Sequence, residues 1–209
     1  MNDNKKFWNR FSRLYTPLQE KSNKKIYDEI INLSDKYLSK DKSMLELACG
    51  TGQFTFSFCK KCKSYIATDF SENMVDETKK RSEKILAIKE RDNISFSVED
   101  ATSLPYEDNS FDIVLIANAL HIMPDPLKAL CEIKRVLKKE GILIAPTFIY
   151  EGKVNRLRLW FIERVGFKTF YKWDKKGCED FIKGEFSNIL ESKIIQGDLL
   201  PELFIVSKK

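Results

Sequence analysis

The sequence predicts an α/β fold built on a doubly wound, mostly parallel sheet. Short apolar runs of strand length alternate along the chain with longer segments whose apolar residues recur at helical spacing. A glycine-containing turn, Gly50-Thr51-Gly52, follows the first of these runs closely. A chain of 209 residues can bury one good hydrophobic core but is too short for two large domains. We therefore expect one domain, residues 1–209, with a small lid.

The predicted elements follow one another in a regular order. Two amphipathic helices come first, at residues 7–18 and 24–38. The core then consists of strands at 43–47, 64–68, 93–99, 111–117 and 141–148, which alternate with helices at 53–62, 72–89 and 125–139. Such alternation is typical of a parallel sheet with helices on both faces. The remaining elements are a basic amphipathic helix at 154–165, a helix at 174–190, and strands at 192–195 and 202–206.

The turn after the first strand has the features of a ligand-binding loop. Its glycines reach backbone angles that other residues disfavour, and without a Cβ they let a ligand approach the main chain. A dinucleotide site of this kind has a third glycine three residues further on, where this chain has Thr55. The acidic residue in the preceding strand, Glu46, suits the ammonium group of S-adenosylmethionine. Glu46 and Thr55 together favour S-adenosylmethionine over NAD.

Further polar residues follow the next strands. Asp69 ends the second strand, nineteen residues after Gly50, where an acid can bind both hydroxyls of a ribose. The third strand leads to Asp100, and the fourth leads to Asn118 and His121. Because the carboxyl ends of parallel strands share one edge of a sheet, we expect these residues to gather at that edge.

Four segments in the right order resemble the class I S-adenosylmethionine-dependent methyltransferases, and more narrowly the subgroup that contains the ubiquinone and menaquinone biosynthesis methyltransferases. The segments are Leu45 to Thr55, Thr68 to Met74, Glu99 to Ala101, and Phe111 to Gly141. The resemblance covers residues 40–148, about half of the chain. The main departure is Lys139-Glu140-Gly141, where Pro-Gly-Gly is usual in the family. The implied fold is a Rossmann-like, seven-stranded sheet closed by an antiparallel C-terminal hairpin.

The resemblance also implies a division of the chain into four parts. Residues 1–40 would form N-terminal helices, 41–148 the cofactor-binding core, 149–175 a helical lid, and 176–209 the last helix and the closing strands.

The same resemblance implies a set of cofactor-binding residues. These are Glu46, Ala48, Gly50, Thr51, Gly52, Asp69, Phe70, Met74, Asp100, Ala101 and Asn118. Glu46, the loop and the backbone of Asn118 would bind the methionine end, and Asp69 would bind the ribose. Phe70 and Met74 would flank the adenine, and Asp100 with the Ala101 N–H would bind its edge. For Phe70, packing in the hydrophobic core is also an open interpretation, and for Met74 it is equally open.

The composition limits the cellular environment in which we expect the protein and the kinds of site that it can form. The five cysteines form an odd, scattered set, and Cys59 and Cys62 lack two further ligands for a zinc site, so we expect neither disulfides nor a metal. We find no long apolar run and no signal-peptide core after Met1, which predicts a soluble, cytoplasmic protein. The net charge of +5 is small, and residues 151–177 account for it.

The methyl acceptor is the least determined part of the prediction. His121, the only histidine, follows the fourth strand and is a candidate general base. Tyr15 and Trp160 are candidates to line an acceptor site under a lid, and they favour a small, apolar, lipid-like or quinone-like acceptor. The basic helix suggests peripheral membrane contact through residues 153–165. An RNA methyltransferase and a non-catalytic S-adenosylmethionine-binding protein stay open as alternatives, and the sequence gives no oligomeric state.

Overall fold

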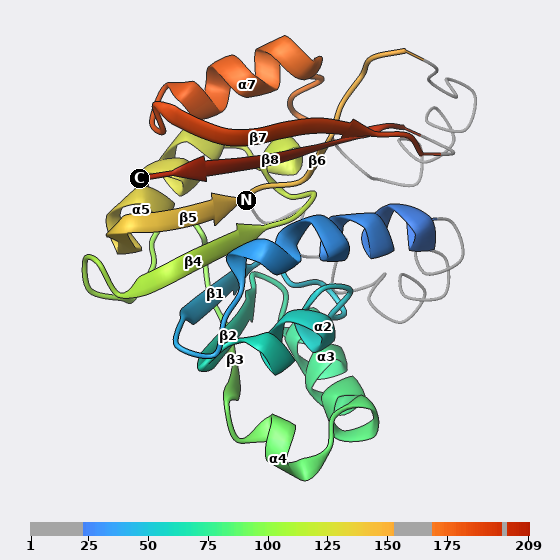
Figure 1. The fold of residues 1–209 in the computed structure, drawn as a ribbon, viewed down its shortest axis with the longest axis vertical. Coiled ribbons are helices and arrows are strands. Elements are labelled where there is room, and N and C mark those ends of the chain that lie inside the picture. The colour runs from blue at the N-terminus through green and yellow to red at the C-terminus, as the bar shows by residue number, and fades with distance from the viewer. Residues whose placement is uncertain (1–22, 153–168, 198–199) are drawn as a thin grey trace.

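One mixed sheet organises the protein (Figure 1). A computed structural model describes residues 23–152, 169–197 and 200–209. In this part of the chain the strands follow the order β3-β2-β1-β4-β5-β8-β6, with β7 paired to β8. Strands β1 to β5 pair in parallel, whereas β8 runs antiparallel to β5, β6 and β7. The predicted doubly wound sheet with an antiparallel C-terminal pair is therefore confirmed.

Most strands lie close to their predicted positions, but those predicted at 141–148 and 192–195 begin four residues earlier. They are β1 (Ser43–Leu47), β2 (Ser64–Asp69), β3 (Ile94–Val98), β4 (Phe111–Ile116), β5 (Leu137–Ile144), β6 (Thr147–Phe148), β7 (Asn188–Ile195) and β8 (Glu202–Lys208). Both β5 and β6 pair with β8, and Pro146 separates them. The expected seven strands become eight because the strand predicted at 141–148 is interrupted at this proline, which has no N–H for a ladder.

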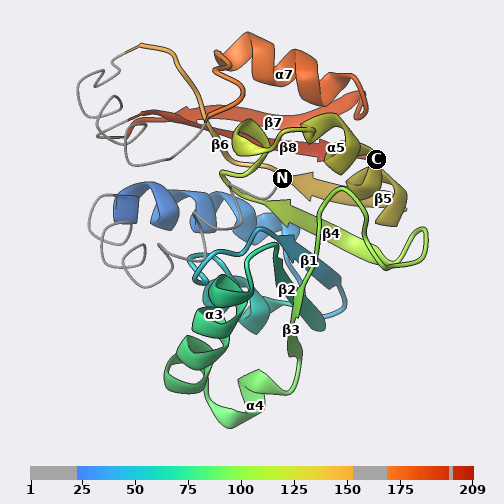
Figure 2. The same ribbon diagram turned by 180° about the vertical axis from the view of Figure 1, so that it is seen from behind.

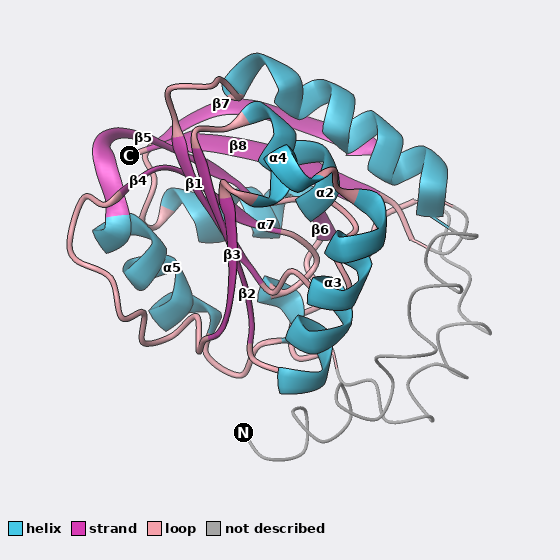
Figure 3. Ribbon diagram, turned by 90° about the horizontal axis from the view of Figure 1, so that it is seen from below, coloured by secondary structure: helices cyan, strands magenta, loops and turns pink. Residues whose placement is uncertain are grey.

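Helices cover both faces of the sheet (Figure 3). A helix over residues 23–34 leads into a short 3-10 turn, Asp35–Tyr37. The remaining helices are α2 (Thr55–Phe58), α3 (Glu72–Ile85), α4 (Ile88–Arg91), α5 (Pro126–Val136) and α7 (Lys175–Lys183), with 3-10 turns at Cys59–Lys61 and Leu120–Ile122. Side-chain caps begin three of them: Ser71 accepts the Met74 N–H, Asp125 the Lys128 N–H and Asp174 the Gly177 N–H.

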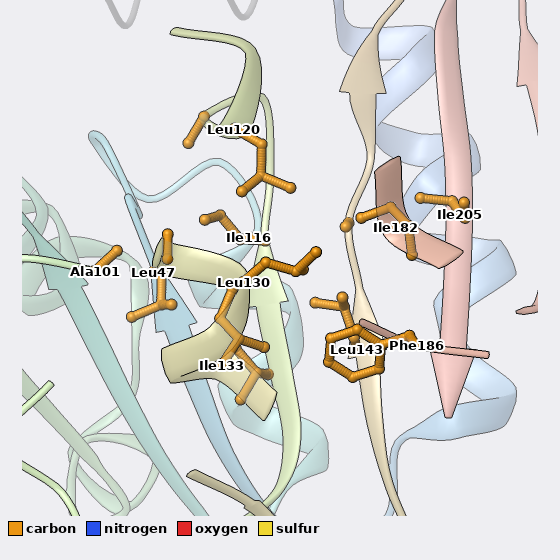
Figure 4. Close-up of a cluster of buried hydrophobic side chains, with 14 of the residues drawn as sticks. Leu47, Ala101, Ile116, Leu120, Leu130, Ile133, Leu143, Ile182, Phe186 and Ile205 are labelled. Carbon is orange, nitrogen blue, oxygen red and sulfur yellow. The ribbon is translucent and has the colours of Figure 1, made fainter. Parts of the chain in front are cut away.

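Two hydrophobic clusters lie on opposite faces of the central strands. Alternate residues of β4 divide between them, since Val114 and Ile116 pack in the cluster under α5 and α7, whereas Ile113 and Leu115 pack in the cluster under residues 23–34 and α2. Figure 4 shows the first cluster, with Leu130 and Ile133 of α5 directed toward the sheet. Central strands buried on both faces explain why the sequence shows continuous apolar runs.

Several predicted boundaries were wrong. The helix predicted at 125–139 ends at Val136, and β5 begins at Leu137, because Phe111 pairs with Leu137 at the start of β4. The helix predicted at 174–190 ends at Lys183, since Asn188 and Ile189 already pair with β8. The helix predicted at 72–89 is divided by Leu86, whose side chain is buried. The helices predicted at 7–18 and 154–165 lie outside the described residues.

Candidate functional site

The turn between β1 and α2 has an unusual backbone. Ala48, Gly50 and Gly52 have positive φ angles of 54°, 55° and 87°. This left-handed conformation costs glycine little, whereas alanine rarely adopts it. A Cβ on Gly52 would lie 2.6 Å from the ring of Phe56, so no larger residue fits without displacing that ring. The turn therefore has a shape that depends on Gly52.

Groups from β2 and α3 hold this turn in place. The Gly50 N–H donates to the Asp69 carboxylate at 2.9 Å, and the Thr78 hydroxyl donates to the Gly50 carbonyl at 2.7 Å. Arg81 donates to the carbonyl of Thr51 and lies over the ring of Phe56. Figure 2 shows α3 beside β2 and β3, which brings these two side chains to the turn. Sequence reasoning missed Thr78 and Arg81, although their spacing places them on one face of a helix.

Asp69 is the acid that the sequence predicts for ribose binding. One carboxylate oxygen accepts the Gly50 N–H, and the other accepts the Ser71 N–H at 2.8 Å. Burial raises the pKa of Asp69 to about 6, and the backbone hydrogen bonds oppose this shift. Each oxygen keeps a second lone pair for another donor. The side chain can therefore accept hydroxyl groups while it holds the turn.

Glu46 lies below the turn in a buried hydrogen-bond network. Its Oε2 atom accepts the hydroxyls of Thr55 at 2.5 Å and Tyr65 at 2.8 Å, and the residue is 2% exposed. Burial raises the pKa of Glu46 to about 7, against the effect of both hydroxyl donors. Thr55, the residue in place of a third glycine, thus supports Glu46. The contact of Glu46 with a methionine ammonium group stays a prediction.

The residues predicted around an adenine follow β2 and β3. Phe70 is half-buried, and Met74 is only 2% exposed at the start of α3. The Asp100 carboxylate accepts the N–H and hydroxyl of Thr102 at 2.9 and 2.7 Å, and Ala101 is buried. The Glu99 N–H donates to the Asp69 carbonyl at 3.1 Å, which joins this turn to the end of β2.

Asn118 and His121 follow β4. Asn118 has a positive φ of 53°, and its amide nitrogen donates to Glu202 of β8 at 3.1 Å. His121 is 2% exposed, and burial lowers its pKa to about 4. Its ring lies edge-on to Phe148, and its carbonyl accepts the N–H groups of Phe170 and Tyr171. Sequence reasoning missed Glu202.

The strand order explains why these residues meet. The order in which successive strands are added reverses between the parallel strands β1 and β4, because β2 and β3 lie on the far side of β1 and β5 lies on the far side of β4. Ligands of open α/β sheets bind beyond the carboxyl ends of the strands at such a point. The turn after β1, Asp69, Asp100 and Asn118 all follow carboxyl ends. Tyr15 and Trp160 lie outside the described residues.

Metal-binding clusters and membrane-spanning helices also bear on the kind of site. In the described ranges, no three histidine, cysteine or acidic side chains gather in a way that could hold a metal ion. The helices of those same ranges include none with the length and apolar character to cross a bilayer. An open hollow of about 600 Å³, lined by Asn109, Lys139, Glu140 and Lys209, lies at the opposite edge of the sheet, so it is separate from the candidate site.

Comparison with known proteins gives consistent matches. Residues 45–145 match the family model described as a methyltransferase domain. A demethylmenaquinone methyltransferase of Staphylococcus haemolyticus is 32% identical over 163 residues, which are 71% of this chain and 66% of the relative. The aligned part thus spans slightly less than two thirds of that relative's length.

Solved structures share the fold at low sequence identity. An S-adenosylmethionine-dependent methyltransferase from Methanosarcina mazei has a TM-score of 0.67 and 19% identity, covering 85% of this chain and 96% of that one. The cyclase SpnF has a TM-score of 0.71 and 18% identity, covering 87% and 80%. Since one neighbour is a cyclase, likeness of fold alone does not determine the reaction.

Proposed function

The chain belongs to the S-adenosylmethionine-dependent methyltransferases, and from this premise we propose that it methylates a small, apolar acceptor. The observation that carries the proposal is the turn after β1, which Asp69, Thr78 and Arg81 hold in place at the carboxyl edge of the sheet. A buried acid beside a glycine-containing turn suits a ligand with ribose hydroxyls and a zwitterionic end.

The residues present fit this cofactor. The hydrogen bonds from Gly50 and Ser71 leave one lone pair free on each oxygen of the Asp69 carboxylate. These free lone pairs would accept the two ribose hydroxyls. The backbone of residues 48–52 and Asn118 would bind the methionine end, with Glu46 beneath them. Phe70, Met74, Asp100 and Ala101 would surround the adenine. When bound, S-adenosylmethionine supplies a methyl group that is already activated on a sulfonium.

The protein's main task is then to position the two reactants and to exclude water. An in-line displacement needs the nucleophile, the methyl carbon and the leaving sulfur aligned, and orientation alone lowers the barrier strongly. The turn after β1 would hold the cofactor, and β4 is the strand next to β1. The acceptor would therefore bind beyond β4, beside Asn118 and His121. His121 is the candidate base for an acceptor that must lose a proton.

The acceptor class rests on the relatives and on aromatic residues. The Staphylococcus relative is named for demethylmenaquinone, which suggests a quinone-like ring for this chain as well. Tyr15 and Trp160 are the proposed lining residues, and residues 153–165 the proposed membrane contact. Binding of the cofactor without methyl transfer is the second candidate, because the same fold also occurs in a cyclase and does not by itself imply methyl transfer.

Calorimetric titration tests the proposal directly. The purified protein is titrated with S-adenosylmethionine, S-adenosylhomocysteine and NAD in parallel. Binding of the first two in the micromolar range, without binding of NAD, is the expected result, on the order of −8 kcal/mol. Binding of NAD alone, or of none of the three, would contradict the proposal.

A second experiment separates the two candidates. Radiolabelled S-adenosylmethionine is incubated with the protein and with hydroxylated naphthalenes, thiols, amines and RNA in turn. Label transferred to a small molecule supports the proposed enzyme, and label on RNA alone contradicts the small-molecule acceptor. Cofactor binding with no label on any compound identifies a protein that binds without transferring.

A further inference from the structure

Three buried polar atoms without a partner belong to residues that follow β4 or begin β8. Among the described residues, the buried side-chain atoms without a hydrogen bond include Asn118 Oδ1, His121 Nδ1 and Glu202 Oε2. Leaving such an atom unpaired costs about 1–3 kcal/mol, so native proteins rarely do so without a water or ligand to fill the place. Three in one cluster indicate a binding position.

A hydrogen bond joins two of these residues, and Phe148 links the third to them. The Asn118 amide donates to Glu202 Oε1 at 3.1 Å. Phe148 of β6 pairs with Glu202 of β8, and cross-strand partners direct their side chains to the same face of a sheet. The His121 ring lies edge-on to Phe148, with 5.9 Å between ring centroids. The cluster therefore extends from the end of β4 across β6 to the start of β8.

The cluster is uncharged at neutral pH. Glu202 is fully buried, and burial raises its pKa to about 8, whereas the hydrogen bond from Asn118 opposes the shift. No charged side chain of the described residues affects this pKa. His121 is neutral as well, because burial lowers its pKa to about 4. A neutral Glu202 donates a hydrogen bond through Oε2, while Asn118 Oδ1 accepts one.

A donor beside acceptors, all uncharged, fits a hydroxyl group better than an anion or an ammonium ion. A hydroxyl accepts one hydrogen bond and donates another, whereas an ion would be left without a countercharge in a buried place. Phe148 provides an apolar neighbour for the rest of the molecule. The position also lies beside the turn after β1, since β1 and β4 are adjacent strands.

We propose that Glu202, Asn118 and His121 form the subsite that binds a hydroxyl group on the ring of the methyl acceptor, with the Glu202 carboxyl as donor. This inference rests on the proposed methyl transfer to a small molecule and assigns the acceptor to hydroxylated aromatic compounds. Glu202 is then a specificity-determining residue that positions the ring beyond β4.

The test compares two probes that differ only at the oxygen. The protein is first saturated with S-adenosylhomocysteine, and 1-naphthol or 1-methoxynaphthalene is then titrated by fluorescence. The methyl ether can accept a hydrogen bond but cannot donate one. We expect 1-naphthol to bind about tenfold tighter or more to the wild-type protein, as one lost hydrogen bond in a buried place implies.

Variants test the donor and the acceptor separately. Glu202→Leu removes the donor to the probe oxygen and should weaken binding of 1-naphthol and of 1-methoxynaphthalene alike, about tenfold or more, whereas Glu202→Gln, which keeps a donor, should bind both within about threefold of wild type. Ser207→Ala is the matched control, because Ser207 lies on the same strand and is also buried with an unpartnered hydroxyl. It should behave as wild type. Asn118→Gly removes the acceptor Oδ1 and should abolish the preference for 1-naphthol; because glycine accepts the φ of 53°, this variant keeps the test available if Glu202→Leu does not fold.

The outcomes are distinguishable. Equal binding of the two probes to the wild-type protein, a preference that survives in Asn118→Gly, or unchanged binding of both probes by folded Glu202→Leu overturns the subsite, while binding of S-adenosylhomocysteine leaves the proposed function intact. Failure of S-adenosylhomocysteine to bind overturns the proposed function instead. A preference for 1-naphthol in the wild-type protein, together with weaker binding of both probes by Glu202→Leu, supports the subsite.

Discussion

The carboxylate of Asp69 accepts the backbone N–H of Gly50 at 2.9 Å, which ties the end of β2 to the turn after β1. Residues nineteen positions apart in the sequence thus determine each other's place. The turn needs this support because its left-handed residues give it no regular hydrogen-bond ladder of its own. An acid at this position therefore orders the loop as well as being available to a ligand.

Replacing Asp69 should weaken cofactor binding. In Asp69→Ala the ribose hydroxyls lose their acceptor and the Gly50 N–H loses its partner, so we expect the affinity for S-adenosylhomocysteine to fall about tenfold or more. Calorimetry measures the change. Asp76→Ala, on the exposed face of α3, is the control and should bind normally. Unchanged affinity in Asp69→Ala would remove this residue from the cofactor site.

Substitutions at two glycines allow the stability cost of backbone strain to be measured apart from the cost of a steric clash. Gly52 and Gly152 both have positive φ, but a Cβ on Gly52 meets Phe56 at 2.6 Å, whereas a Cβ on Gly152 meets nothing within 4 Å. Gly152→Ala should cost about 1 kcal/mol of stability from the left-handed conformation alone. Gly52→Ala should cost a further 1–3 kcal/mol, roughly, from the clash. Urea unfolding of both variants measures the difference, and equal losses would show that the Phe56 ring moves aside freely.

The sequence predicted the parts of the site that follow from local pattern. Glu46, Asp69 and Asn118 each come at or just beyond a short apolar run, and the ends of such runs in a parallel sheet meet at one edge. The structure confirms that the runs are strands and that they lie side by side. The elements, though not all their limits, could therefore be read from periodicity alone.

The missed features depend on long-range contacts. Arg81 reaches Thr51 from α3, and Glu202 reaches Asn118 across 84 residues, so neither contact has a local signal. The early start of β5 at Leu137 has the same cause, because its pairing with Phe111 outweighs the helical pattern of residues 125–139. Tertiary pairing decides such boundaries more often than local propensity.

Stability should depend on pH through Glu202. Its pKa is about 8 in the folded protein and near 4.5 when exposed, so the folded state holds a proton that the unfolded state releases between these values. The contribution of this proton is complete below about pH 4.5 and is lost as the pH rises through about 8. The raised pKa values of Glu46 and Asp69 act in the same direction.

The variant Glu202→Gln isolates this effect, because it keeps the shape of the side chain and cannot ionise. From pH 5 to pH 8 its stability relative to wild type should rise, by at most about 1.4 kcal/mol for each pH unit. Urea unfolding across this range measures the difference, with Ser207→Ala as a non-titrating control on the same strand. A constant difference at all pH values would mean that Glu202 ionises normally in the folded protein.

His121 is the candidate base, and its surroundings predict a modest role. Burial lowers its pKa to about 4, so the ring is neutral at pH 7 but takes up a proton only weakly. Because efficient proton transfer needs a pKa near the working pH, we expect His121→Asn to lower kcat/KM by no more than about tenfold with the acceptor found in the labelling experiment. The asparagine also keeps a polar group beside Phe148. A loss of about a hundredfold or more, together with loss of an inflection in the pH profile, would instead establish His121 as the general base.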